Sequence, residues 1–492
     1  MNRKRRKEWA GALAICLVLA AVMLLFASQS SPLYPINDWV DANCLLTVGR
    51  VMRAGGVVYR DIYEQKGPTL YLLHALAACV SDSSFLGVYL MEVLSLTAAL
   101  FAAYRLFRLR SGRAWALGGT AAWGALILIS PAFCKGDSAE EFCLPLLMAA
   151  TAIAYAEYGR RGKPMRPAWL ALCGVLAGLI FTIKYTLLGA MLGLCLCEGV
   201  LALREGGLRR ALKSAGVFLA GMLVPILLWM IDLAANGALG DAVTAYLINN
   251  IFLYGDEAMS IAEHLKEIAR YMLQNALWGV PAAVGMVMLL CDRGETRAVR
   301  LCMPAMALGQ SVTVLALGRV WRYSLLALAP FAVIGIMQAR RLALRVGCPK
   351  KSSLRGGLAL GACALSLVAA WLWTPNAYLR GQKLENLAQG HLAAYVEPGA
   401  TLLQYSHLDD GLYLTTGTLP QEKYFVRLNV QYDVMLDELD RYVREGIPDY
   451  VLVSWDELPE EFGNYQLIAV DAGYDDDNRL NKALYLYRRR SK

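Results

Sequence analysis

The stretch Arg3–Ala27, RKRRKEWAGALAICLVLAAVMLLFA, places five basic residues directly before a long apolar block. Residues 10–27 of this stretch are numerous enough to cross the ~30 Å hydrocarbon core as a helix. A backbone in lipid must satisfy its own hydrogen bonds, so such a block is expected to be helical. A cleaved signal peptide is the alternative, but the block is long for one and a polytopic chain follows it. We therefore expect an uncleaved anchor.

Ten further apolar blocks follow along the chain. They cover residues 84–104, 115–131, 141–157, 168–183, 186–202, 214–233, 276–291, 299–317, 323–338 and 356–374. The chain is 57% hydrophobic with a mean hydropathy of +0.41, above the 45–50% apolar content of soluble domains. The sequence thus predicts a mainly α protein, a polytopic bundle of about eleven transmembrane helices.

The basic residues between the blocks alternate in a way that predicts topology. Every second gap is rich in arginine and lysine, as at Arg105–Arg113, Arg204–Lys213 and Arg340–Arg355. The other short gaps contain few basic residues, namely Lys135, Lys184, Arg319 and Arg322. The positive-inside rule then places the N-terminus inside and the polar segments 28–83 and 236–277 outside. The basic excess is a topology signal and does not indicate nucleic-acid binding.

The C-terminal part differs in composition from the rest. Residues 376–492 contain 12 basic and 19 acidic residues, a net charge of −7. Since the whole chain has a net charge of +8, residues 1–375 have a net charge of +15. We expect a membrane domain over 1–375 and a soluble α/β domain over 376–492 on the outer face. Alternation predicts strands at 401–406, 424–427, 450–455, 467–470 and 483–487, with an amphipathic helix at 434–444.

Two outer segments are too long to be simple connectors. Segment 28–83 contains an amphipathic stretch, residues 41–53, followed by a turn at Gly55-Gly56. In segment 236–277, residues 261–272 resemble a helix lying in the membrane interface, with Trp278 as its anchor.

The first outer segment also has the densest set of polar side chains. These include Asp38, Asp41, Arg60, Asp61, Glu64 and Lys66. Asp38 and Asp41 are three residues apart and would share one face of a helix. Two neighbouring carboxylates suit a proton acceptor. The plainer interpretation is a solvated loop with a helix cap.

Other charged residues lie near the predicted outer membrane edge. Together with Lys66, the residues Lys184, Arg319 and Arg322 are candidates for binding a phosphate, although these last three could equally anchor to lipid headgroups. Asp137, Glu140 and Glu141 precede the fourth helix and could bind sugar hydroxyls or a cation, or simply cap the helix. The run Asp475-Asp476-Asp477 is expected to be a solvated turn and not a calcium loop.

At this point the residues resemble a known family, the C-type glycosyltransferases, which use polyprenyl-phosphate sugars. The likeness is to bacterial relatives of protein O-mannosyltransferases and of the lipid A aminoarabinose transferase. In those, an acidic residue opens the first outer loop and a Pro-Tyr-Arg-Asp-like stretch follows about eighteen residues later. Here Asp41 is followed by Tyr59-Arg60-Asp61 and then by Glu64-Gln65-Lys66-Gly67-Pro68. The register matches Asp41 to the family's catalytic aspartate and Lys66 to its loop lysine.

The sequence departs from the family's pattern at three places. Asp41 is followed by Ala42 instead of Glu, and Lys66 by Gly67-Pro68 instead of Pro-Pro. The late His-Tyr pair of the relatives reads Arg322-Tyr323. The resemblance implies an inverting transfer in the bacterial cytoplasmic membrane with Asp41 as general base. It implies no required cofactor, and it leaves room for a divalent cation.

The implied partners are a polyprenyl-phosphate-linked sugar donor, the lipid bilayer, and an acceptor that is a glycan, lipid or protein of the cell envelope. Two other functions stay open. A flippase or transporter would want charges near mid-membrane, whereas the charges here gather at the outer rim. A polymerase or ligase of surface glycans would share the outer site and differ in its donor.

Overall fold

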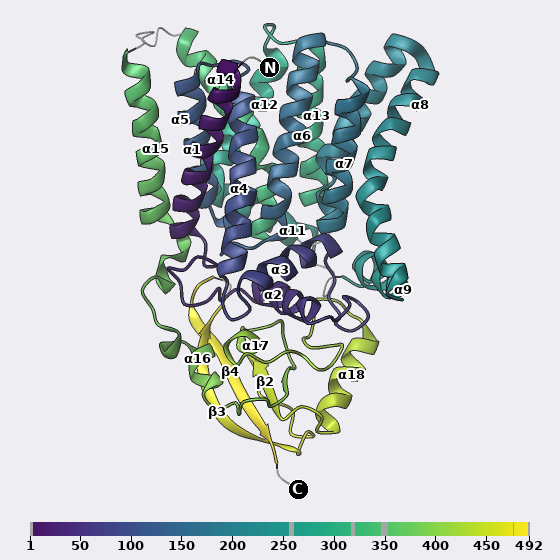
Figure 1. The fold of residues 1–492 in the computed structure, drawn as a ribbon, viewed down its shortest axis with the longest axis vertical. Coiled ribbons are helices and arrows are strands. Elements are labelled where there is room, and N and C mark those ends of the chain that lie inside the picture. The colour runs from purple at the N-terminus through teal and green to yellow at the C-terminus, as the bar shows by residue number, and fades with distance from the viewer. Residues whose placement is uncertain (1–2, 255–259, 316–319, 346–352, 476, 491–492) are drawn as a thin grey trace.

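The computed structural model describes residues 3–254, 260–315, 320–345, 353–475 and 477–490. The chain forms a long helical bundle with a smaller α/β domain at one end of it (Figure 1). The mainly α, polytopic class and the C-terminal sheet domain predicted from the sequence are both confirmed.

The bundle consists of helices that follow the predicted apolar blocks. They are α1 (Arg3–Ala27), α4 (Leu86–Phe107), α5 (Arg113–Leu128), α6 (Ala139–Arg161), α7 (Pro167–Lys184), α8 (Gly189–Ala235), α12 (Ala276–Cys291), α13 (Arg297–Leu315), α14 (Ala329–Arg345) and α15 (Ser353–Trp373). Within the described residues, eight helices are long and apolar enough to cross a membrane, or nine with a bent pair counted as one. Gly206 and Gly207 are non-helical and divide α8 into two helices. With that second half and the 16-residue α5, the predicted set of eleven is complete.

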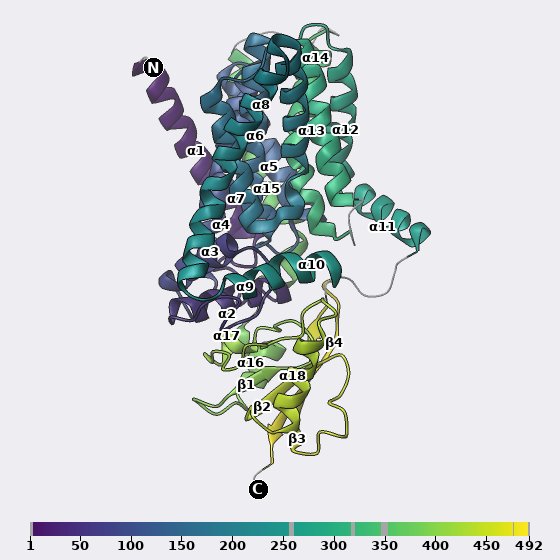
Figure 2. The same ribbon diagram turned by 90° about the vertical axis from the view of Figure 1, so that its right-hand side faces the viewer.

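The two ends of the bundle differ. The N-terminal end of α1 lies at the end remote from the α/β domain (Figures 1 and 2). The α4–α5 connection and the C-terminal end of α14, which contain several arginines, lie at that same end. The described start of α1 and the C-terminal domain therefore lie at opposite ends of the helical bundle.

A layer of short helices separates the bundle from the α/β domain (Figure 2). It contains α2 (Val40–Arg53), α3 (Pro68–Val80), α9 (Leu239–Ala242) and α10 (Asn249–Phe252). The sequence predicted α2 and the turn after it, where Gly55 has a φ of +99° that only glycine adopts readily. The sequence did not predict α3, which is apolar but too short to span.

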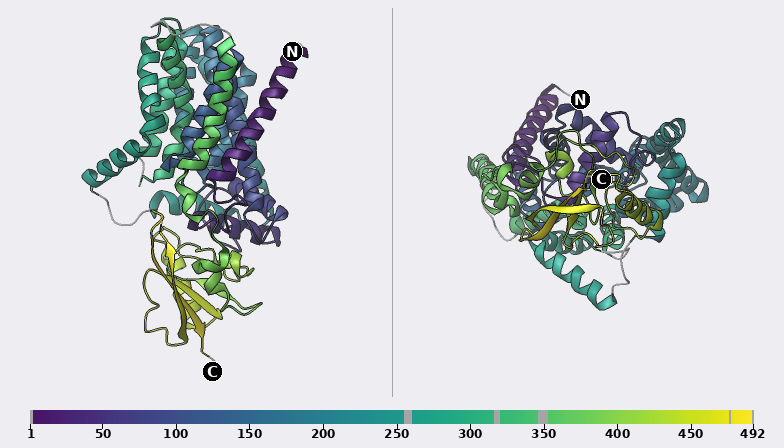
Figure 3. Two further views of the ribbon diagram at one scale, coloured as in Figure 1. Left: turned by 90° about the vertical axis from the view of Figure 1, so that its left-hand side faces the viewer. Right: turned by 90° about the horizontal axis from the view of Figure 1, so that it is seen from below.

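Helix α11 (Ile261–Gln274) projects sideways from the bundle at the end nearer the α/β domain (Figure 3, left). It meets α12 at 98°, and Ile261 and Leu273 are 81% and 77% exposed. These features match a helix lying in the membrane interface. The expected anchor, Trp278, is only 2% exposed and packs inside the bundle, so the interpretation of Trp278 as an interfacial anchor was wrong.

The C-terminal domain is a four-stranded sheet in the order β1-β2-β4-β3. Its strands are β1 (Leu402–Gln404), β2 (Tyr450–Ser454), β3 (Tyr465–Tyr474) and β4 (Leu480–Arg489), and α18 (Asp433–Arg444) lies beside them. β1 pairs in parallel with β2, and the other pairs are antiparallel. The predicted strand at 424–427 is not formed. This segment instead donates Arg427 N–H to the carbonyl of His407 at 3.2 Å and lines a cavity.

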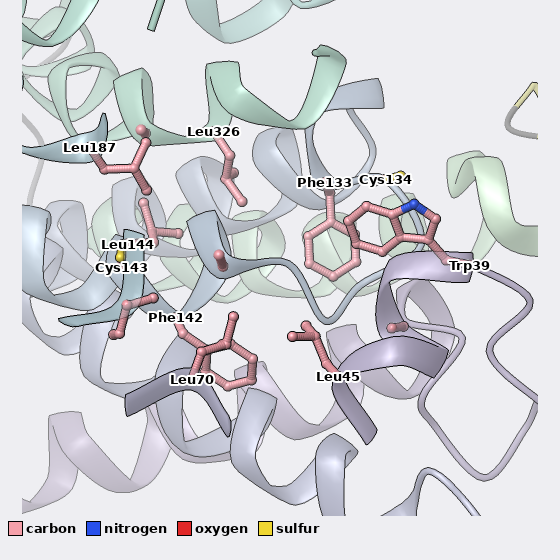
Figure 4. Packing of buried hydrophobic residues seen from close by; sticks show 14 of the residues in the cluster. Trp39, Leu45, Leu70, Phe133, Cys134, Phe142, Cys143, Leu144, Leu187 and Leu326 are labelled. Carbon is pink, nitrogen blue, oxygen red and sulfur yellow. The ribbon is translucent and has the colours of Figure 1, made fainter. Parts of the chain in front are cut away.

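The first outer segment is part of the core and not a solvated loop. Figure 4 shows Trp39, Leu45 and Leu70 in the same buried cluster as Phe133 and Phe142. All five side chains are at most 6% exposed. Because this segment is packed against the bundle, its polar side chains are held in fixed positions.

Candidate active site

A cavity of about 1200 Å³ lies where the bundle, the layer of short helices and the α/β domain meet. Of the sequence-predicted site residues, five line it: Asp41, Lys66, Lys184, Arg322 and Tyr323. They come from α2, the loop before α3, the end of α7 and the start of the 3-10 helix Arg322–Leu328. The cavity thus collects residues that are up to 280 positions apart in the sequence.

Asp41 and Lys66 form an ion pair in the lining of this cavity. The Lys66 ammonium lies 2.8 Å from Asp41 Oδ1 and 3.3 Å from Glu64 Oε1. Burial disfavours the ammonium, but the two carboxylates outweigh this effect and hold the pKa of Lys66 well above its ordinary value. Of the two carboxylates that share this ammonium, only Asp41 lines the cavity.

The backbone of Lys66 is fixed from both sides. Tyr59 OH donates to the Lys66 carbonyl at 2.6 Å, and Lys66 N–H donates to Tyr71 OH at 2.7 Å. Tyr71 OH in turn donates to Glu64. Gly67 N–H donates to the carbonyl of Ile183 at 3.0 Å, a bond that proline could not make. This bond excludes the proline that the resembling family has here, and glycine is favoured because a Cβ would lie 2.2 Å from the Thr182 carbonyl oxygen.

Asp38 does not share a site with Asp41. It precedes α2, is 7% exposed, and accepts from Lys135 at 2.7 Å and from Tyr378 OH. The expectation that Asp38 and Asp41 act as a coupled carboxylate pair is therefore replaced by two separate lysine–aspartate pairs. Lys135 lines the cavity, whereas Asp38 lies behind it.

Lys184 follows the same arrangement. Its ammonium is 2.8 Å from Glu140 Oε1, and Glu140 is 1% exposed. The ammonium also lies 5.3 Å from the ring centre of Tyr323, a cation–π geometry. Trp39 meets that ring edge-on at 5.2 Å. An aromatic surface next to a paired lysine can contact the apolar face of a sugar ring.

The lining of the cavity has an excess of positive charge. Arg270, Arg322 and Arg427 line it in addition to its lysines, and among the described lining residues only Asp41 and Asp477 are acidic. Asp477 lies 3.9 Å from both Arg270 and Arg322. Two guanidinium groups around one carboxylate form a group suited to binding a phosphate. The expected solvated turn at Asp475–Asp477 holds for Asp477, whose side chain is 47% exposed, and was wrong for Asp475, which is 6% exposed and paired with Arg479. Asp476 lies outside the described residues.

Three predicted site residues lie away from the cavity. Arg60 and Asp61 pair with each other at 2.7 Å on the surface, and Arg60 also donates to the Asn236 carbonyl. Asp137 is fully buried and accepts from His74 at 2.8 Å, and burial raises its pKa above the ordinary value. Glu64, by contrast, acts behind the cavity through Lys66. Arg319 lies outside the described residues.

The walls of the cavity differ in polarity. Toward the bundle, the lining includes apolar side chains from around the start of α8, from α10 and from the end of α13. They are Leu188, Leu192, Ile251 and Val314. Toward the C-terminal domain it is polar: Ser406, His407, Arg427, Asn429 and Gln431. An alkyl chain fits against the first wall, and a hydroxyl-bearing molecule fits against the second.

Several lining residues had no signal in the sequence. Arg270 stands on an interfacial helix, and His407 and Arg427 stand in the C-terminal domain, whose docking on the bundle cannot be read from the sequence. Lys135 could have been found, because it is a lone lysine in an outer gap with few basic residues. In the portion of the chain that the structure describes, no cluster of three or more His, Cys, Asp or Glu could hold a metal ion.

The fold is that of the C-type membrane glycosyltransferases, and the resemblance drawn from the sequence is confirmed at this level. No protein-family model matches the chain, and no curated protein sequence matches it.

The particular likenesses are to solved structures. ArnT from Cupriavidus metallidurans bound to undecaprenyl phosphate superposes with a TM-score of 0.62 at 14% identity, over 95% of this chain and 97% of that one. The apo state of the same protein gives 0.63 at 14% identity, over 98% of each chain. The arabinofuranosyltransferase AftD from Mycobacteria gives 0.51 at 15% identity, over 100% of this chain and 42% of that one. At such identity the likeness establishes the fold.

Proposed function

We propose that this protein is a membrane glycosyltransferase that moves a sugar from a polyprenyl-phosphate carrier to an acceptor hydroxyl, with inversion at the anomeric carbon. The observation that carries the proposal is that a carboxylate and several arginines line one cavity. Asp41, paired with Lys66, and the guanidinium groups of Arg270, Arg322 and Arg427 belong to the same lining. Group transfer from a phosphate needs both a base and a cationic site for the leaving group.

The apolar wall favours a lipid-linked donor. A polyprenyl chain would lie along Leu188, Leu192 and Val314, with its phosphate at Arg270 and Arg322. The phosphate is already a good leaving group, so cations need only stabilise its charge as it departs. One structure with this fold, ArnT from Cupriavidus metallidurans, is bound to undecaprenyl phosphate.

The proposed reaction is a single displacement. Asp41 removes the proton from the acceptor hydroxyl while that oxygen forms a bond to C1 of the sugar. The bond between C1 and the phosphate oxygen breaks, and polyprenyl phosphate leaves with both electrons. Lys66 and Glu64 hold the Asp41 carboxylate in place, and Lys184 with Tyr323 orients the sugar.

The acceptor is proposed to enter from the C-terminal domain. The polar wall formed by His407, Arg427 and Asn429 offers hydrogen-bond partners that suit a glycan of the cell envelope, or the polar part of a lipid or protein acceptor. The domain then contributes binding surface while the base stays in the membrane part. Following the positive-inside rule, we place this cavity on the outer face.

The test is transfer in sealed proteoliposomes containing a polyprenyl-phosphate sugar labelled in the sugar. Supplied with envelope acceptor, the protein should form labelled product and free polyprenyl phosphate in equal amounts. Movement of the intact labelled lipid across the bilayer without bond cleavage would overturn the proposal in favour of a flippase. Turnover only with a pyrophosphate-linked oligosaccharide would overturn it in favour of a polymerase or ligase.

A further inference from the structure

A second cavity, of about 320 Å³, lies at the end of the bundle remote from the candidate active site. Its walls come from α5, α14, α15 and the end of α4. None of its lining residues takes part in the proposed transfer, so it needs a separate explanation.

The interior of this cavity is a slot between helices with small residues. Gly118, Gly119 and Ala122 of α5 face Ala359 and Ala362 of α15. A Cβ placed on Gly118 would lie 3.4 Å from the Cβ of Ala362, so the two helices cross closely at this point. None of these side chains is long enough to fill the space beside the crossing. A space of this kind offers water few polar partners and suits an alkyl chain.

The mouth of the slot has a different character. Arg110 and Arg341 lie at it and both bind Glu295, at 2.5 and 2.8 Å. Arg340 places its guanidinium 5.4 Å from the ring centre of Trp115, which also lines the mouth. A tryptophan and several arginines at a helix end are typical of the headgroup level of a membrane.

The charges at this mouth do not cancel. Arg341 and Arg345 approach Asp292, and Arg110 and Arg341 approach Glu295. Among the described residues, three arginines thus approach these two carboxylates, and Arg340 lies at the same mouth. The surplus of positive charge favours an anionic group at the opening.

We propose that this slot binds one acyl chain of an anionic phospholipid, whose phosphate contacts Arg340 at the mouth. The apolar interior accounts for the chain, and the positive rim accounts for the charged head. Neither feature alone would select this ligand, because a free anion needs no slot and a neutral lipid needs no arginine. Basic pockets between helices at the cytoplasmic side are suited to anionic headgroups. The site is independent of the proposed transferase activity.

The test is native mass spectrometry of the full chain released from nanodiscs of phosphatidylglycerol and phosphatidylcholine with matched acyl chains. We expect phosphatidylglycerol to remain bound in preference to phosphatidylcholine. Arg340→Gln should lower the retained phosphatidylglycerol about fivefold, the equivalent of one surface cation. The control, Arg209→Gln, removes an exposed arginine at the turn of α8 at the same end of the bundle and should change nothing.

A steric variant and a labelling experiment make the test independent of charge and of variant folding. Ala122→Phe fills the slot and should reduce the retention of lipid of either headgroup. In the wild-type protein, phosphatidylglycerol with a photoreactive acyl chain should label peptides containing residues 107–122, 336–341 or 358–362. Equal retention of both lipids, labelling elsewhere, or replacement of phosphatidylglycerol by added undecaprenyl phosphate would overturn the proposal.

Discussion

The carboxylate of Asp409, in the C-terminal domain, accepts a hydrogen bond of 2.7 Å from the hydroxyl of Thr47 on α2. Two further contacts join the same face of that helix to the domain. Arg50 donates to the carbonyl of Tyr413 at 3.0 Å, and Asp409 N–H lies 3.3 Å from the sulfur of Cys44. Residues 44, 47 and 50 are three apart and therefore share one helical face. Since α2 also carries Asp41, the C-terminal domain helps to set the position of the proposed base.

This junction predicts a pH dependence of stability. Burial raises the pKa of Asp409 from an ordinary 3.8 to about 6. Between these values the folded protein holds the proton more tightly than the unfolded chain, so the free energy of unfolding falls as pH rises through this window. The fall amounts to roughly 3 kcal/mol and is complete above about pH 6.

Asp409→Asn keeps the shape and removes the titration. We expect the variant to lose this fall, so the gap between variant and wild-type thermal midpoints should change from pH 4 to pH 7, with the variant gaining at the higher pH. Scanning fluorimetry in detergent measures both midpoints. A constant gap across the window would show that Asp409 is ionised in both states.

Gly67 predicts a steric sensitivity beside the site. A Cβ on this residue would lie 2.2 Å from the carbonyl oxygen of Thr182, which is backbone and cannot rotate away. Gly67→Ala must therefore displace Lys66, and a shift of about 1 Å costs on the order of 100-fold in rate. Gly112→Ala is the matched control, since no atom lies within 4 Å of its added Cβ. The measurement is the transfer rate of both variants. Equal rates for Gly67→Ala and Gly112→Ala would contradict the claim that the backbone at Gly67 fixes the position of Lys66.

Lys66 is expected to act through the carboxylate it holds. Lys66→Met leaves Asp41 and Glu64 close together without their shared ammonium, so one of them should take up a proton. We expect a loss of about 100-fold or more in kcat, with the optimum of the pH profile moved upward. Lys66→Arg restores the charge and should recover part of the rate. An unchanged pH profile in the methionine variant would contradict this role.

A double variant can distinguish the structural role of Lys184, which is to pair with Glu140, from its proposed role in binding the donor. Lys184→Gln alone leaves the buried Glu140 carboxylate unpaired, which destabilises the protein as well as the site. Lys184→Gln combined with Glu140→Gln should recover the thermal midpoint but not the affinity for the donor. Arg60→Gln, on the surface of the same outer face, should leave both unchanged. Donor titrations distinguish the three proteins.

The sequence was sufficient for the bundle because lipid imposes long apolar helices, and their number and order could be read from the blocks. Asp41 and Lys66 were selected by the family resemblance and Lys184 as a lone charge at a predicted membrane edge, and all three line the cavity. Their roles in transfer stay predictions. The sequence could not place Arg60 and Asp61 on the surface, since a motif records spacing and not burial. Nor could it bring His407 or Arg427 to the cavity, because their place depends on how the C-terminal domain docks on α2.

The most direct test of the account compares Asp41→Asn with Asp61→Asn in the reconstituted transfer assay. Asp61 belongs to the same outer segment but lies outside the cavity. We predict that Asp41→Asn lowers the transfer rate by about 10³-fold while donor binding persists, and that Asp61→Asn transfers at the wild-type rate. Transfer by Asp41→Asn near the wild-type rate would contradict the assignment of the base and, with it, the proposed mechanism.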